Sequence, residues 1–202
     1  MILSQERIIG LYGMKGAGKT TLGRYLMSIY MRNGIKTILY NTDLEKEQPN
    51  KLLTNYEPVE ENAVDLAYLN DWIKKTRATN SNTLIYIRDL DAFFDKNSSL
   101  SKASSELKDI STRGRHTRNP LIYESKQPRY IPAKLISNTD LFFIANFSES
   151  VDLDRFKSID TYRILSKLPK HTFLEYDRWE MSRKIIYFDI ASNKIKVLKE
   201  LK

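Results

Sequence analysis

The sequence predicts an α/β fold in which helices flank a mainly parallel central sheet, with a β-hairpin extension at the carboxyl end. Two observations support this class. Short apolar runs alternate with longer segments in which apolar residues recur at helical spacing, and a glycine-rich loop joins the first run to the first such segment. The 202 residues suit one unit with a full core. We divide it into a core over residues 1–150 and an extension packed on that core over residues 151–202.

The first strand is expected over residues 7–12, directly before the glycine-rich loop. A helix should follow the loop and end at Asn33-Gly34, a pair typical of helix ends. The apolar face of this helix comprises Leu22, Tyr25, Leu26, Ile29 and Tyr30. Strand, glycine loop and helix thus follow one another without interruption.

Four more core strands are expected, over residues 35–40, 83–87, 121–124 and 141–147. The last is apolar throughout, as central parallel strands usually are. One helix should begin near Asn62, a second should contain Leu107 and Ile110, and a third should begin at Pro132. Residues 44–60 are polar and contain two prolines, which favours an excursion outside the core.

The last third of the chain differs from the rest. A helix is expected over residues 152–167, followed by strands over residues 172–176, 184–189 and 195–198. Ala191-Ser192-Asn193 predicts a hairpin turn between the last two strands. We therefore expect an extension packed on or beside the main sheet.

The glycine-rich loop at residues 13–20 fits the phosphate-binding pattern G-x-x-x-x-G-K-[ST] at every constrained position. Glycines let successive backbone N–H groups turn toward phosphate oxygens, and the positive end of the following helix faces the same anion. Lys19 should reach the β- and γ-phosphates of ATP, and the Thr20 hydroxyl should help to hold Mg²⁺. The expected nucleotide-binding residues are Gly13, Met14, Lys15, Gly16, Ala17, Gly18, Lys19, Thr20 and Thr21.

Composition excludes several classes of protein. The absence of cysteine excludes disulfides and Cys-ligated zinc, and two isolated histidines argue against a His-based metal site. No apolar run approaches the roughly 18 residues of a membrane span, and the amino end lacks a signal-peptide pattern. These features predict a soluble intracellular protein.

Positive charge predicts a polyanionic partner. The formal charge is +8 and the isoelectric point about 9.4. Residues 113–134 concentrate this charge, with Arg113, Arg115, Arg118, Lys126, Arg129 and Lys134 against a single acid, Glu124. We expect this segment to contact phosphate or nucleic acid.

A P-loop enzyme also needs a carboxylate on a neighbouring strand, bound to Mg²⁺ directly or through water. The strand at residues 83–87 is the best source. Arg88 occupies the position where the metal-binding acid is commonest, and Asp89 follows. We favour an assignment in which Asp89 is the metal carboxylate, displaced by one residue, because Arg88 would add positive charge against the metal.

The sequence leaves more than one candidate for the base that orients the attacking water. If Asp89 serves the metal, the base lies elsewhere, at Asp91, Asp43 or Glu45. If Asp89 is instead the base, then Thr20, phosphates and water hold the metal. Asp91 has an equally good role as a turn or helix cap.

The order of the strands suits the additional-strand class of P-loop NTPases. In this class the fourth strand inserts between the strand before the loop and the strand that carries the acid. Gln127, just past the fourth strand, would then lie near the γ-phosphate and could sense it or place the water. A loop hydrogen bond beside Pro128 is the alternative role.

Several motifs together resemble the FtsK/HerA superfamily of DNA-pumping ATPases. They are Gly13 to Thr20, Ile85-Tyr86-Ile87-Arg88-Asp89, Arg115-His116, Gln127-Pro128 with Ile131-Pro132, and Asn138 to Phe143. The resemblance is strongest to the small viral genome-packaging branch found in archaeal turreted icosahedral viruses, to which the Leu168 to Phe173 segment is also similar.

This resemblance implies an ATPase, with ATP and Mg²⁺ bound by Lys19 and Thr20, Asp89 as the acidic-strand carboxylate and Gln127 as the family's glutamine. It implies a homo-oligomeric ring, pentamer or hexamer, that translocates double-stranded DNA. An arginine enters the neighbouring subunit's site in such rings, and Arg113 and Arg115 are the candidates. A capsid vertex or a membrane-associated virion protein would dock the ring in the host cytoplasm.

Two other functions fit part of the pattern. A small-molecule or nucleotide kinase shares the same loop, although no lid of spaced arginines is evident. A nucleotide-gated assembly switch that binds ATP without hydrolysis would tolerate the irregular Arg88-Asp89 pair. Phosphate release that rises with duplex DNA would favour the motor over both.

Overall fold

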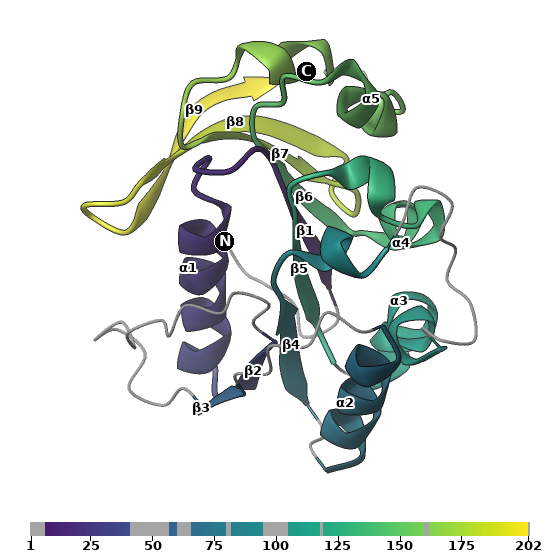
Figure 1. The fold of residues 1–202 in the computed structure, drawn as a ribbon. Helices are drawn as coiled ribbons and strands as arrows, with labels where there is room; N and C mark the ends of the chain where they lie inside the picture. Colours follow the sequence, from purple (N-terminus) through teal and green to yellow (C-terminus); the bar gives the residue numbers. More distant parts are fainter. Residues whose placement is uncertain are drawn as a thin grey trace.

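The computed structural model describes residues 7–40, 57–59, 66–79, 82–94, 105–117, 119–159 and 162–201. Within these ranges the chain forms a nine-stranded sheet in the order β3-β2-β4-β5-β1-β6-β7-β8-β9 (Figure 1). The strands are β1 (Ile8–Tyr12), β2 (Lys36–Tyr40), β3 (Glu57–Val59), β4 (Thr83–Ile87), β5 (Leu121–Ser125), β6 (Leu141–Ile144), β7 (Thr172–Asp177), β8 (Ser182–Asp189) and β9 (Lys194–Leu201).

Helices connect the parallel strands. The α-helices are α1 (Lys19–Arg32), α2 (Leu66–Thr79), α3 (Ser105–Thr117), α4 (Ala133–Asn138) and α5 (Ser150–Leu153). The 3₁₀ turns are η1 (Leu90–Phe93), η3 (Pro128–Tyr130), η4 (Asp154–Phe156) and η5 (Tyr162–Lys167). Among the described residues, no helix is both long and apolar enough to cross a lipid bilayer.

Strand β5 lies between β1 and β4 and pairs in parallel with both. This insertion confirms the predicted additional-strand order. From β3 to β6 every pairing is parallel, whereas β7, β8 and β9 join in antiparallel fashion. The sheet therefore has a parallel half that contains the glycine-rich loop and an antiparallel half built by the carboxyl end of the chain.

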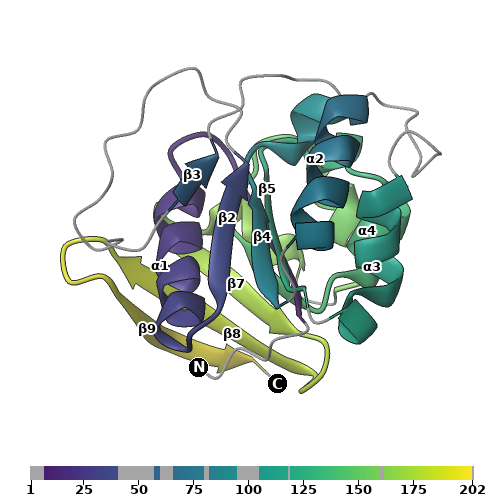
Figure 2. The same ribbon diagram turned by 90° about the horizontal axis from the view of Figure 1, so that it is seen from below.

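Two hydrophobic cores cover the two faces of the parallel half (Figure 2). Helix α1 lies on one face, against the cluster that contains Ile9, Leu11 and Tyr86. Helices α2, α3 and α4 lie on the other face. The cluster there contains Ile8 and Tyr12, the neighbours of Ile9 and Leu11 along β1. Alternation along each strand thus sends successive side chains into opposite cores.

Two expected elements differ from the structure. The polar segment at residues 44–60 was expected to contain no core element, yet Glu57–Val59 forms β3, a short edge strand beside β2. Pro58 suits an edge because proline donates no hydrogen bond to the ladder. The single helix expected over residues 152–167 is wrong: α5, η4 and η5 replace it, and residues 160 and 161 lie outside the described ranges.

Other boundaries shift by a few residues. The strand expected over residues 141–147 ends at Ile144, and the last strand extends over Lys194–Leu201. The boundary that we placed at residue 150 stays a prediction. The extension continues the sheet, since β7 pairs with β6.

Candidate nucleotide-binding site

The glycine-rich loop joins β1 to α1 at the carboxyl edge of the parallel strands. Its backbone is tied to both neighbouring strand ends: Gly13 N donates to Ser125 O over 3.2 Å, and Met14 N donates to Asn146 O over 3.2 Å. Gly18 precedes the helix with a φ of 95°, a left-handed conformation that favours glycine. The loop is therefore fixed at its base while its tip curves over the amino end of α1.

Lys19 is buried, and only 5% of its surface is exposed. Its Nζ donates to Gly13 O over 2.7 Å and to Met14 O over 3.1 Å. Burial lowers the pKa of the amine, and the nearby Glu124 carboxylate opposes that shift. The ammonium group is held by weak neutral acceptors of its own loop, which a phosphate can replace.

A cavity of about 270 Å³ lies over the loop. It is lined by Lys15, Gly16, Gly18, Lys19, Thr20, Thr21, Arg88, Asp89, Glu124, Lys126 and His171. The structure thus brings Asp89 together with the predicted loop residues. Lys126 belongs to the basic segment that the sequence predicted to contact phosphate or nucleic acid. Sequence reasoning assigned no site role to Arg88, Glu124 or His171, which also line the cavity.

Glu124 is the most deeply buried charged group of the cavity wall, with 1% of its surface exposed. Thr20 Oγ1 donates to its Oε2 over 2.9 Å, and the Tyr86 hydroxyl donates to its Oε1. The Arg88 guanidinium lies beside it, with Nε 4.0 Å from Oε1. Burial raises the pKa of the Glu124 carboxyl, while Tyr86, Arg88 and Lys19 act in the opposite direction.

Asp89 has a left-handed backbone, with a φ of 44°, at the turn that begins η1. Its Oδ2 accepts a hydrogen bond from Lys126 Nζ over 2.9 Å. Its Oδ1 is buried and has no hydrogen-bond partner in the described part of the chain. One carboxylate oxygen is therefore available to a ligand of the cavity.

Asp91 and Gln127 lie beside a second cavity of about 380 Å³, which also involves Met14 and Lys15. The two Asp91 oxygens accept hydrogen bonds from Lys126 N over 3.0 Å and Gln127 N over 3.2 Å. Burial raises the pKa of Asp91. This geometry favours the capping role for Asp91, because both its oxygens fix the turn after β5. Gln127 itself is exposed.

The remaining candidates are only partly placed. Arg113 and Arg115 lie on the last turns of α3, whose helix packs beside α2 on the sheet face opposite α1 (Figure 2). Their side chains lie outside the described part, as do Asp43 and Glu45 entirely. Their predicted roles therefore stay predictions.

His171 comes from the antiparallel half and reaches the loop. A Cβ atom added to Gly18 would lie 2.7 Å from His171 Nδ1, so the ring lies against that glycine. Nδ1 is buried, and no described group forms a hydrogen bond with it. The backbone φ of His171 is 60°, which turns the chain into β7 at this point. A lone histidine before a late strand gave no signal of this contact in the sequence.

The donor set fits a Mg²⁺-nucleotide. Backbone N–H groups and Lys19 suit phosphate oxygens, and Thr20, Asp89 and Glu124 are oxygen ligands of the kind that Mg²⁺ prefers. Among the described residues, no three His, Cys, Asp or Glu side chains cluster in a way that could hold a metal alone. Mg²⁺ usually keeps several water and phosphate ligands and needs few ligands from the protein.

No protein-family model matches the chain, and no curated protein matches it either. Solved structures do match. B204, the DNA-packaging ATPase from Sulfolobus turreted icosahedral virus, has a TM-score of 0.74 at 15% identity over 99% of this chain and 100% of that chain. The chain has the fold of a viral genome-packaging NTPase. The predicted fold class, with its antiparallel carboxyl-terminal strands, is confirmed by this likeness.

Other similar structures extend the comparison. The genome packaging NTPase B204 from Sulfolobus turreted icosahedral virus 2, in complex with AMPPCP, has a TM-score of 0.74 at 17% identity over 98% of this chain and 100% of that chain. The pCW3 conjugation coupling protein TcpA has a TM-score of 0.57 at 16% identity over 85% of this chain and 57% of that one. The B204 fold therefore covers the whole chain, whereas TcpA shares the fold over a smaller part.

Proposed function

We propose that this chain is the ATPase of a ring-shaped motor that moves double-stranded DNA and packages a viral genome into a preformed capsid. The observation that carries the proposal is the extent of the likeness to B204: 99% of this chain and 100% of that one. The TM-score of that match, 0.74, also exceeds the 0.57 of TcpA. Here both halves of the sheet correspond to a DNA-packaging ATPase.

The loop residues bind the triphosphate of ATP in this proposal. Backbone N–H groups of residues 13–20 face the β- and γ-phosphates, and Lys19 exchanges its carbonyl acceptors for phosphate oxygens. Water then attacks the γ-phosphate in line with the departing ADP. Asp89 faces the same cavity, where its unpartnered oxygen can accept a proton from the water or hold a water ligand of the metal.

Mg²⁺, when bound, would neutralise charge on the β- and γ-phosphates. Thr20 and Asp89 are the residues of our sequence-based assignment that would hold it, and both line the cavity. Gln127 lines the adjoining cavity with Met14 and Lys15, and in this proposal it senses the nucleotide through these loop residues.

The motor would work as a homo-oligomeric ring. Arg113 or Arg115 would enter the neighbouring subunit's site and stabilise charge in the transition state. The net charge of +8 supports contact with a DNA backbone. Such contacts are largely independent of sequence and weaken steeply as salt increases.

The decisive experiment measures phosphate release and oligomer mass in the same tube during a titration with blunt duplex DNA. We expect both to rise with DNA at low salt, and hydrolysis to fall by about a hundredfold or more in Lys19→Ala. Lys36→Ala, a matched lysine on β2 away from the cavity, should retain the wild-type rate. If the native protein with DNA hydrolyses ATP no faster than Lys19→Ala, the motor proposal is wrong.

One observation favours a second candidate, a nucleotide-gated assembly switch. Lys126 already occupies one oxygen of Asp89, so only the other oxygen is left to act on a water. A switch would bind ATP analogues and change its oligomer mass with no DNA-stimulated turnover. Phosphate transfer that requires a small acceptor would instead indicate a kinase.

A further inference from the structure

The acid that β4 lacks is present on the neighbouring strand. Strands β4 and β5 pair in parallel with Ile87 beside Tyr123. Continuing that register by one residue sets Arg88 beside Glu124, and Arg88 Nε lies 4.0 Å from Glu124 Oε1. The position that commonly carries the carboxylate holds an arginine, and the adjacent position on the inserted strand holds a glutamate.

Glu124 also lies on the face of the sheet that the loop helix covers. Its neighbour in the β1 register is Leu11, which belongs to the core beneath α1. Thr20, in the first turn of α1, donates its hydroxyl hydrogen to Glu124 Oε2 over 2.9 Å. The carboxylate is thus directed toward the residue that is expected to bind the metal.

This hydrogen bond has the orientation that a metal site requires. A threonine that coordinates Mg²⁺ uses an oxygen lone pair and keeps its proton, which then needs an acceptor. Groups that accept hydrogen bonds from metal ligands fix the orientation of those ligands and raise their basicity. Glu124 is such an acceptor in the structure.

The other oxygen of Glu124 is also accounted for. The Tyr86 hydroxyl donates to Oε1, and Arg88 supplies a positive charge beside it. Burying a carboxylate is costly without such partners. Arg88 therefore stabilises the buried carboxylate of Glu124 on β5, and it does not repel a metal held at the end of β4.

We propose that Glu124 is the metal-site carboxylate of this chain: it orients Thr20 toward Mg²⁺, in place of the acid missing at position 88. The inference rests on the proposed function of the same site. It leaves Asp89, with its unpartnered Oδ1, to orient the attacking water. This is the second of the two assignments that the sequence left open for Asp89.

The test compares the affinity of AMPPCP with Mg²⁺ and with EDTA by calorimetry, since neither measurement depends on turnover. We expect Mg²⁺ to strengthen binding in the native protein. Glu124→Gln should reduce that gain by about tenfold or more, the usual effect of losing the partner of a metal ligand. Affinity in EDTA should change little.

Moving the acid from position 124 to position 88 distinguishes a metal role of Glu124 from a purely structural one. The double variant Arg88→Asp with Glu124→Gln returns the acid to β4, and we expect it to recover part of the Mg²⁺ gain. Glu175→Gln, which alters a buried glutamate of β7 that does not line the cavity, should behave as wild type. Recovery would not follow if Glu124 only stabilised the fold.

The outcomes distinguish the two proposals. If Glu124→Gln keeps the full Mg²⁺ gain while Lys19→Ala loses nucleotide affinity, the role of Glu124 is wrong and the ATPase proposal stands. If the native protein binds Mg²⁺-AMPPCP but shows no DNA-stimulated hydrolysis, the motor proposal fails and the metal role is judged on binding alone. Should Glu124→Gln not fold, Glu124→Asp replaces it: the shortened carboxylate should lose part of the gain, and an unchanged gain overturns the inference.

Discussion

The two halves of the sheet differ in how far their strands are buried. In the parallel half, every residue of β1, β4 and β5 is buried, because α1 covers one face and α2, α3 and α4 cover the other. In the antiparallel half, most residues of β8 and β9 are partly or fully exposed. A charged residue in the first environment needs a specific partner, whereas most charged residues of β8 and β9 can rely on water.

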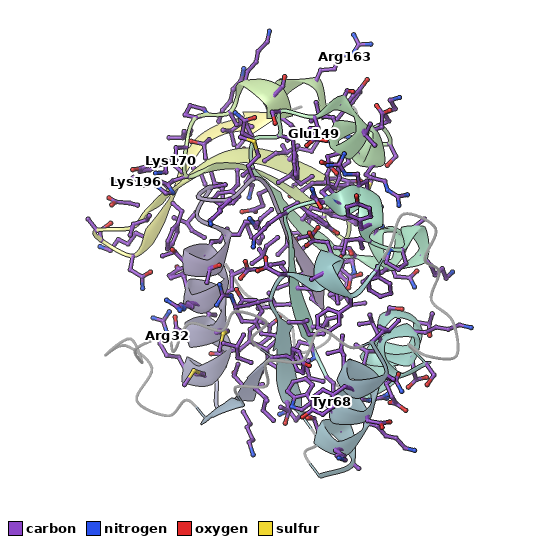
Figure 3. The ribbon with its side chains drawn as sticks, in the orientation of Figure 1. Arg32, Tyr68, Glu149, Arg163, Lys170 and Lys196 are labelled. Carbon is purple, nitrogen blue, oxygen red and sulfur yellow. The ribbon has the colours of Figure 1, made fainter. Side chains whose placement is uncertain are left out.

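This difference indicates which charged residues point to a function. Glu124 and Arg88 stand at the ends of fully buried strands, and each has a defined partner. The lysines of β9 are exposed, and the pair that Lys196 forms with Asp189 is itself exposed to solvent. The end of α1 marked by Arg32 points away from the antiparallel strands, while its loop end lies beneath them (Figure 3). The nucleotide site thus lies where the two halves meet.

The largest expected effect is on packing in the parallel half. In Gly23→Ala the new Cβ would lie 2.1 Å from the Tyr86 hydroxyl and 3.0 Å from Leu11 Cδ1. Overpacking of this kind outweighs the better helix propensity of alanine, and we expect a loss of about 2 kcal/mol in the free energy of unfolding. Thermal denaturation should show a melting temperature roughly 4–8 °C lower.

The matched change in the antiparallel half is Leu198→Ala on β9, where the leucine is 59% exposed. Its free energy of unfolding should change by no more than about 0.5 kcal/mol. Equal losses for the two variants would mean that the halves do not differ in packing as the burial pattern indicates.

Sequence reasoning found the elements whose signal is local. The loop at residues 13–20 and strands β1, β4 and β5 have strong patterns, and their order gave the fold class. Glu124 was missed because an acid after three apolar residues also marks the end of a strand. Its meaning depends on the register between β4 and β5, which places it beside Arg88 and below Thr20.

Other features were not predicted for the same reason, because they depend on contacts between distant parts of the chain. Strand β3 has no apolar run and forms by pairing with β2. His171 reaches Gly18 only because β7 continues the sheet next to β6. The helix expected over residues 152–167 gave way to short turns whose buried residues, such as Phe156 and Leu165, pack on the core at irregular spacing.

A smaller effect is expected where the halves touch. His171 lines the cavity with an unpartnered ring nitrogen, so a bound phosphate can provide the missing partner. We expect His171→Ala to weaken AMPPCP binding by about tenfold, the lower end for hydrogen bonds to charged groups. Calorimetry would measure this, with Lys170→Ala, an exposed neighbour, as the control. Unchanged affinity would mean that the antiparallel half supports the sheet but takes no part in nucleotide binding.

The smallest effect concerns a buried acid in the antiparallel half. Glu175 on β7 is 9% exposed, and burial raises its pKa, although Lys184 on β8 opposes the shift. A carboxyl whose folded pKa lies above its unfolded value costs stability as the pH rises through that interval. Glu175→Gln removes this cost. Its melting temperature should match wild type near pH 4 and equal or exceed it at pH 7, as measured by thermal denaturation across that range. A variant that is less stable than wild type only at pH 7 would show that the attraction of the Lys184 charge outweighs desolvation, and that buried acids in the antiparallel half also depend on nearby charges.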